Sequence, residues 1–377
     1  MAKGLYLSLM IGPVVPVPVG QTVIDALTSA QVTVTAGANS QSGFQLGFNL
    51  GKNSPLETIF LLAGGAIPPI LRVILVVTVN GTSEVLIDGV VTRTDVKPGE
   101  GGGPATLTVT GVDLTAVMDW IDFTGFPFPA LPPEARVALM IAKYAMFGLI
   151  PMVIPSVLID IPIPIDRIPR QQGTDYGYIT QLAEEVGYVF YLKPGPTPGT
   201  NVAYWGPEIK VGSPQPALNV DMDAHTNVES LSFNFNGESA ELPIVLIYNQ
   251  ETKVMIPIPV PAITPLNPPL GLLPPIPKKL RWVEGTGKYS PVRAALIGMA
   301  KASQTADAVS GSGSLDVLRY GRPLRARELV GVRGAGTAFD GLYYVKSVTH
   351  DIKKGEYKQS FTLGRNGLVS TLPKVPA

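Results

Sequence analysis

The stretch Thr174–Leu192 reads TDYGYITQLAEEVGYVFYL and predicts a helix that runs directly into a strand. Thr174 is a favourable helix N-cap residue, and Gly187 is a favourable terminator. Between them, apolar residues recur at helical spacing: Ile179, Leu182, Ala183 and Val186. The aromatic run Tyr188–Leu192 then predicts a strand, with which Asn201–Trp205 could pair.

A second helix is predicted just before this stretch, over Pro133–Phe147. Its apolar residues again share one face, and Gly148 would stop it. That face consists of Val137, Met140, Ile141, Tyr144 and Phe147. The middle of the chain therefore reads as a small α+β unit.

The first third of the chain reads as β-structure, beginning with a strand at Leu5–Ile11. Gln31–Thr35 and Thr106–Val112 alternate polar and apolar residues, as half-buried strands do. Asn80-Gly81 lies between two β-branched runs, which predicts a tight hairpin turn. The runs are Arg72–Val79 and Ser83–Val91, and Gly99–Gly103 reads as a further hairpin loop. Asn80-Gly81-Thr82 also fits a glycosylation acceptor, but the turn explains these residues fully.

β-structure returns in the last third, interrupted by one alanine-rich helix that Ser290 and Pro291 would start. The predicted strands are Val228–Phe235, Ile244–Tyr248, Glu328–Val332, Tyr343–Val348 and Tyr357–Leu363. Ser310–Ser314 (SGSGS) reads as a loop after the helix.

Several of the 37 prolines alternate with apolar residues, at Val15–Val19, Ile161–Ile165 and Ile256–Pro261. Proline cannot donate to a sheet ladder, so these segments cannot be central strands. Docking arms between subunits and rigid surface loops both fit this pattern, and the sequence favours neither.

The composition is 45% hydrophobic and only 15% charged, with 29 basic and 29 acidic residues and no cysteine. No basic field exists to attract nucleic acid or an anionic membrane. A weakly charged surface is easier to keep soluble if partner subunits cover much of it. Prolines and charges interrupt the two longest apolar stretches, Ile59–Val79 and Phe147–Ile165, so we expect core strands and buried loops there rather than membrane spans.

No standard catalytic constellation is present, and the two histidines are His225 and His350. Asp221, Asp223 and His225 alternate and could share a strand face as metal ligands. A solvated edge or loop explains them better, because a metal site needs a converging ligand set. Gly285–Lys288 lacks the first glycine and the hydroxyl residue of a phosphate-binding loop, and Glu184 and Glu185 point to different helix sectors. We therefore expect no catalytic, cofactor-binding or metal-binding residues.

Two segments resemble one protein family, in addition to their physical reading. The first segment resembles the late control D proteins of phages in three features. Asp175-Tyr176 opens a helix, LAEE-x-G closes it, and an aromatic strand follows. Those proteins are tail hubs, and the amino-terminal part of VgrG spikes is similar to them. The matching residues are Asp175, Tyr176, Leu182, Ala183, Glu184, Gly187, Tyr188 and Phe190.

The second segment, Phe339–Leu368, resembles the closing strands of that family. The matching residues are Gly341, Tyr343, Val345, Val348, His350, Gly355, Tyr357, Phe361 and Arg365. Gly111-Val112-Asp113-Leu114 is a weaker third match. The three matches follow the family's order, while the Pro-rich Ile256–Pro277 lies outside its pattern. We expect His350 to lie on the solvent or subunit side of its strand, or to be buried with its hydrogen bonds satisfied.

The resemblance implies a β-rich α+β fold, in which two tube-like β-barrel domains carry an inserted α+β domain. We expect a first barrel at 1–116, an insert at 117–212, a second barrel at 213–249 and 286–377, and a Pro-rich insertion at 250–285. The two barrels would share one topology.

The resemblance also implies a structural role in a contractile tail or phage-like injection system. The chain would be a homotrimeric baseplate hub between a hexameric inner tube and a separate trimeric spike, because no spike domain follows Ala377. It would contact other baseplate subunits but no specific nucleic acid, and no membrane in the resting state. Such a hub assembles in the bacterial cytoplasm and becomes part of a virion or particle. Two alternatives stay open: a tail-associated cell-wall hydrolase and a surface-binding β-protein.

Overall fold

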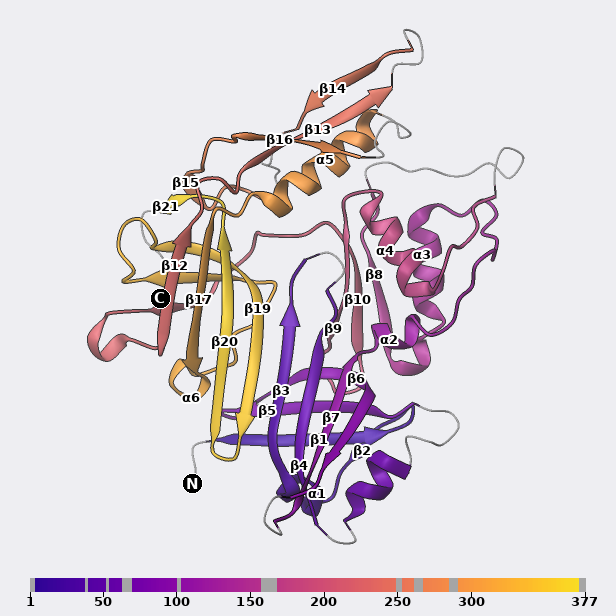
Figure 1. Cartoon of the computed structure of the whole chain (residues 1–377), viewed down its shortest axis with the longest axis vertical. Helices are drawn as coiled ribbons and strands as arrows, with labels where there is room; N and C mark the ends of the chain where they lie inside the picture. The colour runs from indigo at the N-terminus through magenta and orange to yellow at the C-terminus, as the bar shows by residue number, and fades with distance from the viewer. Residues whose placement is uncertain are drawn as a thin grey trace.

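The computed structural model describes residues 4–37, 40–51, 54–62, 70–99, 103–156, 168–248, 253–260, 267–284 and 291–372. Strands are the commonest element among these residues, and the largest sheet draws on strands from both ends of the chain (Figure 1). The helices within residues 115–184 lie together at one side, beside a small sheet (Figure 1). The predicted β-rich α+β class is confirmed.

Six strands from the first third form one half of the large sheet, in the order β1-β5-β6-β7-β4-β3. They are β1 (Leu5–Gly12), β3 (Leu27–Thr35), β4 (Gly43–Leu50), β5 (Arg72–Val79), β6 (Thr82–Lys97) and β7 (Ala105–Asp113). The short β2 (Val17–Pro18) extends the edge of β1, and α1 (Gln21–Ala26) and the π-helix η1 (Glu57–Leu62) lie between strands. Figure 1 shows β1 and β5 crossing β3 and β4 at a steep angle.

Six strands from the last third form the other half, in the order β11-β18-β19-β20-β17-β12. They are β11 (Gln215–Asn219), β12 (Ser230–Phe235), β17 (Val309–Asp316), β18 (Leu329–Arg333), β19 (Gly341–Lys353) and β20 (Glu356–Arg365). The short helix α6 (Val317–Tyr320) follows β17 and is capped by the Asp316 carboxylate.

The two halves repeat one strand order. Numbered from one to six along the chain within each half, both read 1-4-5-6-3-2 across the sheet. Every neighbouring pair is antiparallel in both halves, except that β11 runs parallel to β18 where β1 runs antiparallel to β5. We call them the first repeat and the second repeat. The expected common topology is therefore present.

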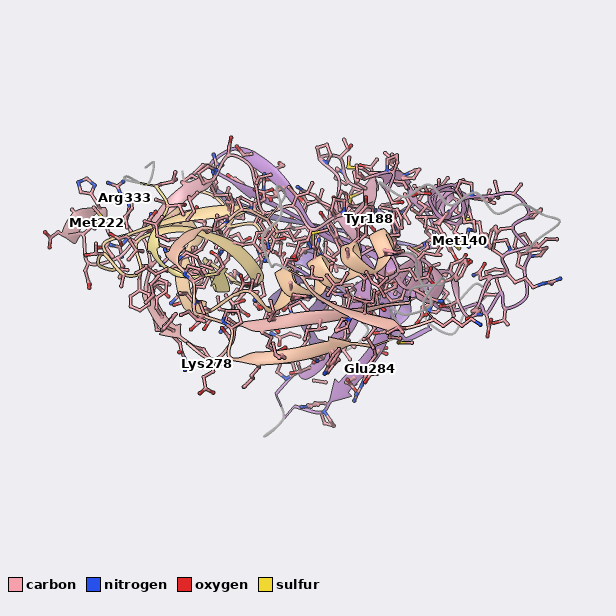
Figure 2. All side chains as sticks on the ribbon, turned by 90° about the horizontal axis from the view of Figure 1, so that it is seen from above. Met140, Tyr188, Met222, Lys278, Glu284 and Arg333 are labelled. Carbon is pink, nitrogen blue, oxygen red and sulfur yellow. The ribbon has the colours of Figure 1, made fainter. Side chains whose placement is uncertain are left out.

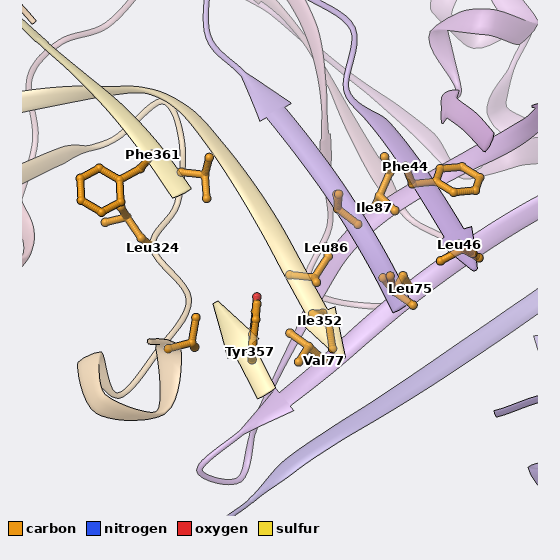
Figure 3. Packing of buried hydrophobic residues seen from close by; sticks show 14 of the residues in the cluster. Phe44, Leu46, Leu75, Val77, Leu86, Ile87, Leu324, Ile352, Tyr357 and Phe361 are labelled. Atoms are coloured by element: carbon orange, nitrogen blue, oxygen red, sulfur yellow. The ribbon is translucent and has the colours of Figure 1, made fainter. Parts of the chain in front are cut away.

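The repeats are joined edge to edge, because β3 pairs with β19 over seven residues. One apolar core accordingly draws on both repeats: Figure 3 shows Val77 and Leu86 of the first beside Ile352 and Tyr357 of the second. Two separate barrels were expected; among the described residues no strand pairing closes either repeat on itself. The strands instead form one continuous sheet.

The inserted α+β unit lies between the repeats in the sequence and beside the sheet in space (Figure 1). It contains α2 (Thr115–Met118), α3 (Pro133–Ala142), the 3₁₀ turn η4 (Ala145–Phe147), β8 (Leu149–Val153), α4 (Asp175–Glu184), β9 (Val189–Pro194) and β10 (Asn201–Gly206). β10 is central, antiparallel to β9 and parallel to β8. Ile179, Leu182 and Val186 are buried in its core, as predicted.

A third group packs the helix α5 (Pro291–Thr305) against a small sheet of β13 (Glu241–Tyr248), β14 (Met255–Pro259) and β16 (Lys279–Val283). β15 (Gly271–Leu273) pairs with the last strand, β21 (Leu368–Ser370). Proline-rich β14 pairs only with β13 and so lies at an edge, as expected. The segment Ile161–Ile165 lies outside the described residues.

Local signals were reliable guides to single elements. The Thr174 hydroxyl accepts from Gly177 N at 3.1 Å and caps α4. Asn80 and Gly81 have positive φ angles of 51° and 83° and turn the β5–β6 hairpin. The prediction of core strands and buried loops for Ile59–Val79 is partly wrong, because Glu57–Leu62 is helical.

The prediction of a loop at Ser310–Ser314 is wrong, because these residues form the middle of β17 between β12 and β20. The serines alternate with glycines, so all serines share one face. A side chain on Gly311 would meet Phe233 at 2.9 Å, and one on Gly313 would meet Phe361 at 2.9 Å. Glycine makes room for aromatic rings from the neighbouring strands.

None of the helices in the described part of the chain is long and apolar enough to cross a membrane.

Candidate assembly surfaces

One face of the large sheet is lined by polar side chains, many of which carry hydroxyl groups. Five hydroxyl residues lie opposite one another across five strands of both repeats: Ser230, Ser314, Ser360, Thr349 and Thr33. A second row continues across the first repeat through Gln31, Gln45, Thr110 and Arg93. All nine side chains are exposed or half-exposed. We call this surface the hydroxyl face.

Hydrogen bonds between strands order the hydroxyl face. Oxygen atoms lie 2.9 Å apart in Ser230–Ser314, 3.1 Å apart in Ser232–Ser312 and 2.6 Å apart in Ser347–Thr362. Where the repeats join, the Thr33 and Thr349 hydroxyl oxygens are 3.1 Å apart, and Gln31 Nε2 donates to Asp351 Oδ1 at 2.8 Å. The polar surface is thus continuous across the junction.

Among the edges of this sheet that have no partner strand within the described residues are those of β12 and of the second half of β6. β12 is the last strand of the second repeat and pairs only with β17. The second half of β6, from Arg93 to Lys97, pairs only with β7. Val96 and Phe235 on these edges are large apolar side chains with 44% and 39% exposure. Unpaired edges that carry apolar groups are ready to add another strand.

A buried ion pair fastens the inserted unit to the first repeat. Arg72 on β5 and Asp88 on β6 form two hydrogen bonds, of 2.6 and 2.7 Å, and both side chains are at most 3% exposed. Arg72 Nη2 also donates to the Phe147 carbonyl at 2.7 Å, and Asn201 Nδ2 donates to Asp88 at 2.7 Å. The desolvated charges are therefore compensated from both units.

Arg327 connects the two repeats and the inserted unit. Its Nε donates to the Thr35 carbonyl of β3 at 3.0 Å, and Nη1 donates to the Leu192 carbonyl of β9 at 3.3 Å. The guanidinium lies 4.0 Å from the centre of the Tyr191 ring. Burial lowers the pKa of Arg327, although Tyr191 and Asp113 oppose this effect. Arg327 is thus positioned to hold the insert against the junction of the repeats.

Residues that carried the family resemblance have structural roles. Asp175 is fully buried at the start of α4 and accepts from Lys143 at 3.0 Å, Tyr144 at 2.8 Å and Gln171 at 2.7 Å. Asp113 ends β7 and accepts from Ser42 N at 2.8 Å and from the Thr115 hydroxyl. Burial raises the pKa of Asp113, against the effect of these hydrogen bonds.

His350 is buried, so the satisfied alternative holds. Gln359 Oε1 accepts from Leu324 N, and its Nε2 therefore points at Nδ1 of His350, 3.1 Å away. The Tyr357 hydroxyl is 2.7 Å from the same nitrogen. Gln359 and Tyr357 thus both hydrogen-bond to Nδ1 and hold the buried ring in place. Burial lowers the pKa of His350 to about 3.

Asp221, Asp223 and His225 do not share a strand face. Asp223–His225 is a 3₁₀ turn, and both aspartates have positive φ angles near 48°. All three are half-exposed or exposed, and Figure 2 places neighbouring Met222 at the far end of the molecule. Among the described residues no group of three or more histidine or acidic side chains could hold a metal ion. The solvated turn, which was the better explanation, is what the structure has.

The other residues considered in the sequence analysis do not reveal a functional site. Glu184 is exposed and Glu185 half-exposed at the end of α4, and Gln181 Nε2 donates to Glu185 at 3.4 Å. Gly285–Lys288 lies outside the described residues.

The third group presents an exposed apolar sheet surface. Opposite α5, the exposed side chains include Met255, Leu280 and Trp282. Figure 2 shows β16 between Lys278 and Glu284, running along this side of the molecule.

Comparison with known proteins depends on structure alone, because the sequence matches no protein-family model and no curated protein at a significant level. A tail protein from Neisseria meningitidis MC58 aligns over 97% of this chain and 98% of its own, with a TM-score of 0.63 and 12% identity. The 43 kDa tail protein of prophage MuSo2 from Shewanella oneidensis aligns over 96% and 98%, with a TM-score of 0.59 and 14% identity. The fold is that of phage tail proteins.

This tail-protein fold also occurs in a spike-related assembly. A chain of the Francisella PdpA–VgrG complex aligns over 100% of this chain and 60% of its own, with a TM-score of 0.60 and 8% identity. The expected likeness to tail proteins and VgrG is confirmed at the level of the fold.

Sequence reasoning missed the hydroxyl face, although its signal was present. Serine and threonine alternate with apolar or glycine residues in β7, β12, β17 and β20. Alternation alone marks a half-buried strand; the frequency of serine and threonine on one face was the additional signal.

Proposed function

We propose that three copies of this chain form the baseplate hub of a contractile tail or phage-like injection system. The hub would join a sixfold inner tube to a threefold spike and would do mechanical rather than chemical work. A fold alone does not define a function; the proposal depends on a property of this chain.

The observation that carries the proposal is the repeated strand order 1-4-5-6-3-2 within one continuous sheet. A subunit with two equivalent repeats offers two similar surfaces. Three such subunits in a closed ring offer six, which matches a hexameric tube on one side while keeping threefold symmetry for a spike on the other.

The hydroxyl face supports a ring with an open axis. A sheet face of serine, threonine and glutamine would be costly to bury against apolar partners, whereas it can line a wet channel without loss of hydrogen bonds. We assign this face to the inside of the ring and the inserted α+β unit to its outside.

The partners follow from this geometry: the inner tube protein on one rim, a separate spike protein on the other and further baseplate subunits around the outside. The hub would assemble in the bacterial cytoplasm and become part of a virion or phage-like particle. The proposal assigns no bond-breaking step. Purified protein should therefore release no soluble fragments from peptidoglycan, and a release abolished by substituting one acidic residue would favour the hydrolase alternative.

Native mass spectrometry and electron microscopy test the assembly. We expect a species of three times the chain mass and rings with threefold symmetry that bind the end of the cognate inner tube. A protein that stays monomeric at high concentration in the presence of tube and spike, or that forms twofold rings, contradicts the proposal.

A further inference from the structure

The two repeats share one irregularity of strand pairing. β6 occupies the position of β19, and each shifts register by one residue against its neighbour. The shift falls between Val91 and Arg93 in β6 and between Val345 and Ser347 in β19. A one-residue bulge is a local and specific feature, so Thr92 and Lys346 mark equivalent positions. Counting onward from them makes Val96 equivalent to His350.

The same counting relates β12 to β3. In each repeat, a path of directly opposed residues starts at the residue before the bulge. It crosses two neighbouring strands and ends on the outer strand, which is β3 in the first repeat and β12 in the second. The paths are Val91, Gly111, Phe44, Val32 and Val345, Leu363, Gly311, Phe233. Phe233 of β12 is therefore equivalent to Val32 of β3.

Within one chain, β19 and β3 pair with each other, and they are the strands equivalent to β6 and β12. β19 lies antiparallel to β3, with His350 opposite Val32, Thr349 opposite Thr33 and Val348 opposite Val34. The corresponding edges, the second half of β6 and β12, have no partner among the described strands. Seven strand spacings, roughly 34 Å of sheet, separate these edges in one chain.

We propose that Arg93–Lys97 of β6 pairs antiparallel with Ser232–Asn236 of β12 in a second copy of this chain, in the register of the β3–β19 junction. The register sets Thr94 opposite Phe235, Asp95 opposite Asn234 and Val96 opposite Phe233. This inference rests on the proposed ring, in which three such contacts would alternate with three junctions inside the chains.

The side chains fit this register. Val96 meets Phe233 on the core side, where the equivalent His350 is only 5% exposed. Asp95 meets Asn234 on the hydroxyl face, where the amide can donate to the carboxylate as Gln31 donates to Asp351 inside the chain. A slip of one residue would set Val96 opposite Asn234 and move every side chain to the wrong face. The pairing also covers two edges that would otherwise be open.

Cysteine crosslinking in the full-length protein tests the pairing, because the natural chain has no cysteine. Two double variants place cysteines at opposed positions, Thr94→Cys/Phe235→Cys and Asp95→Cys/Asn234→Cys. Neighbouring antiparallel pairs alternate between wide and narrow Cα spacings, so at least one suits a disulfide. Thr33→Cys/Thr349→Cys is the matched control within one chain, and Asp95→Cys/Ser230→Cys is the out-of-register control.

Under mild oxidation we expect disulfide-linked dimers and trimers of chains from at least one in-register variant. The Thr33/Thr349 control should lose its free thiols while its denatured mass stays that of a single chain. The out-of-register variant should stay uncrosslinked. Native mass spectrometry of the same samples separates the two ideas. A trimer in which neither in-register pair links the chains, although the internal control closes, overturns the pairing and leaves the hub intact. Absence of any trimer overturns the hub and the pairing together.

Discussion

The Tyr357 hydroxyl and Nδ1 of His350 form a hydrogen bond of 2.7 Å in the core of the second repeat. His350 lies directly opposite Val32 of the first repeat. A neutral imidazole is therefore built into the junction on which the continuity of the sheet depends. Because burial lowers the pKa of His350 to about 3, the folded chain resists protonation of this ring.

This resistance predicts an acid-sensitive stability. An unfolded histidine has a pKa of about 6.5, so between pH 6.5 and about 3 the unfolded state binds a proton that the folded state does not. The free energy of unfolding should therefore be unaffected by His350 above pH 6.5 and should fall below it, by about 2 kcal/mol at pH 5. Urea titrations at several pH values measure the slope. His350→Gln should remove this component, whereas His225→Gln in the exposed turn should keep it; equal slopes in all three proteins would refute the assignment.

Removal of Arg72 should be strongly destabilising. Arg72→Met leaves Asp88 buried without its counter-charge, which costs about 3–5 kcal/mol. Replacing both residues, as in Arg72→Met/Asp88→Leu, should recover part of that loss, because no lone charge remains. Lys193→Met breaks an exposed 3.4 Å pair with Glu328 and should cost no more than about 1 kcal/mol. Chemical denaturation ranks the three variants, and an equal cost for Arg72→Met and Lys193→Met would contradict the buried role.

Gly311 should not tolerate a side chain, although it lies in a serine–glycine stretch. A Cβ there would contact the Phe233 ring at 2.9 Å, and overpacking of this kind costs about 1–3 kcal/mol. Ser312→Val, on the opposite face of the same strand, is the matched control and should change the melting temperature little. A melting temperature unchanged by Gly311→Val would mean that β17 does not pack as described.

Leu182 is 3% exposed in the core of the inserted unit. Leu182→Ala should lower the free energy of unfolding by about 2–5 kcal/mol, the usual cost of truncating a buried leucine. Leu139→Ala removes a 46% exposed side chain of α3 and should have a much smaller effect. If the two variants melt together, the inward face of α4 has been assigned to the wrong residues.

Features that depend on adjacent residues were predictable from the sequence. The Asn80-Gly81 turn and the Thr174 cap both follow from local backbone chemistry, and both are present. The strand at Ser310–Ser314 was not predictable in this way, because it depends on Phe233 and Phe361, which come from other strands. A serine–glycine stretch predicts a loop when it is considered alone, because the aromatic rings that pack over the glycines come from distant parts of the sequence.

The internal repeat was predicted from symmetry and could not be read from residue identities. Equivalent positions exchange large and small residues: Phe44 in β4 corresponds to Gly311 in β17, while Gly111 in β7 corresponds to Leu363 in β20. In the first repeat the aromatic ring comes from the inner strand, and a Cβ on Gly111 would meet Phe44 at 2.3 Å. In the second repeat the aromatic ring is that of Phe233, on the outer strand β12. Each single position differs between the repeats, although an aromatic ring covers a glycine in both.

The serine, threonine and glutamine side chains of the hydroxyl face have a consequence for anything that moves past them. A wall of hydroxyl groups exchanges hydrogen bonds with water at little net cost, and charged side chains on the same face are paired, as Arg93 is with Asp95 and Lys358 is with Glu356. A strand of DNA or an unfolded polypeptide would therefore experience low friction, whatever the sign of its charge. Its transit rate should change little between dilute and concentrated salt, in contrast to passage along a basic groove, where counterion release makes every step depend on ionic strength.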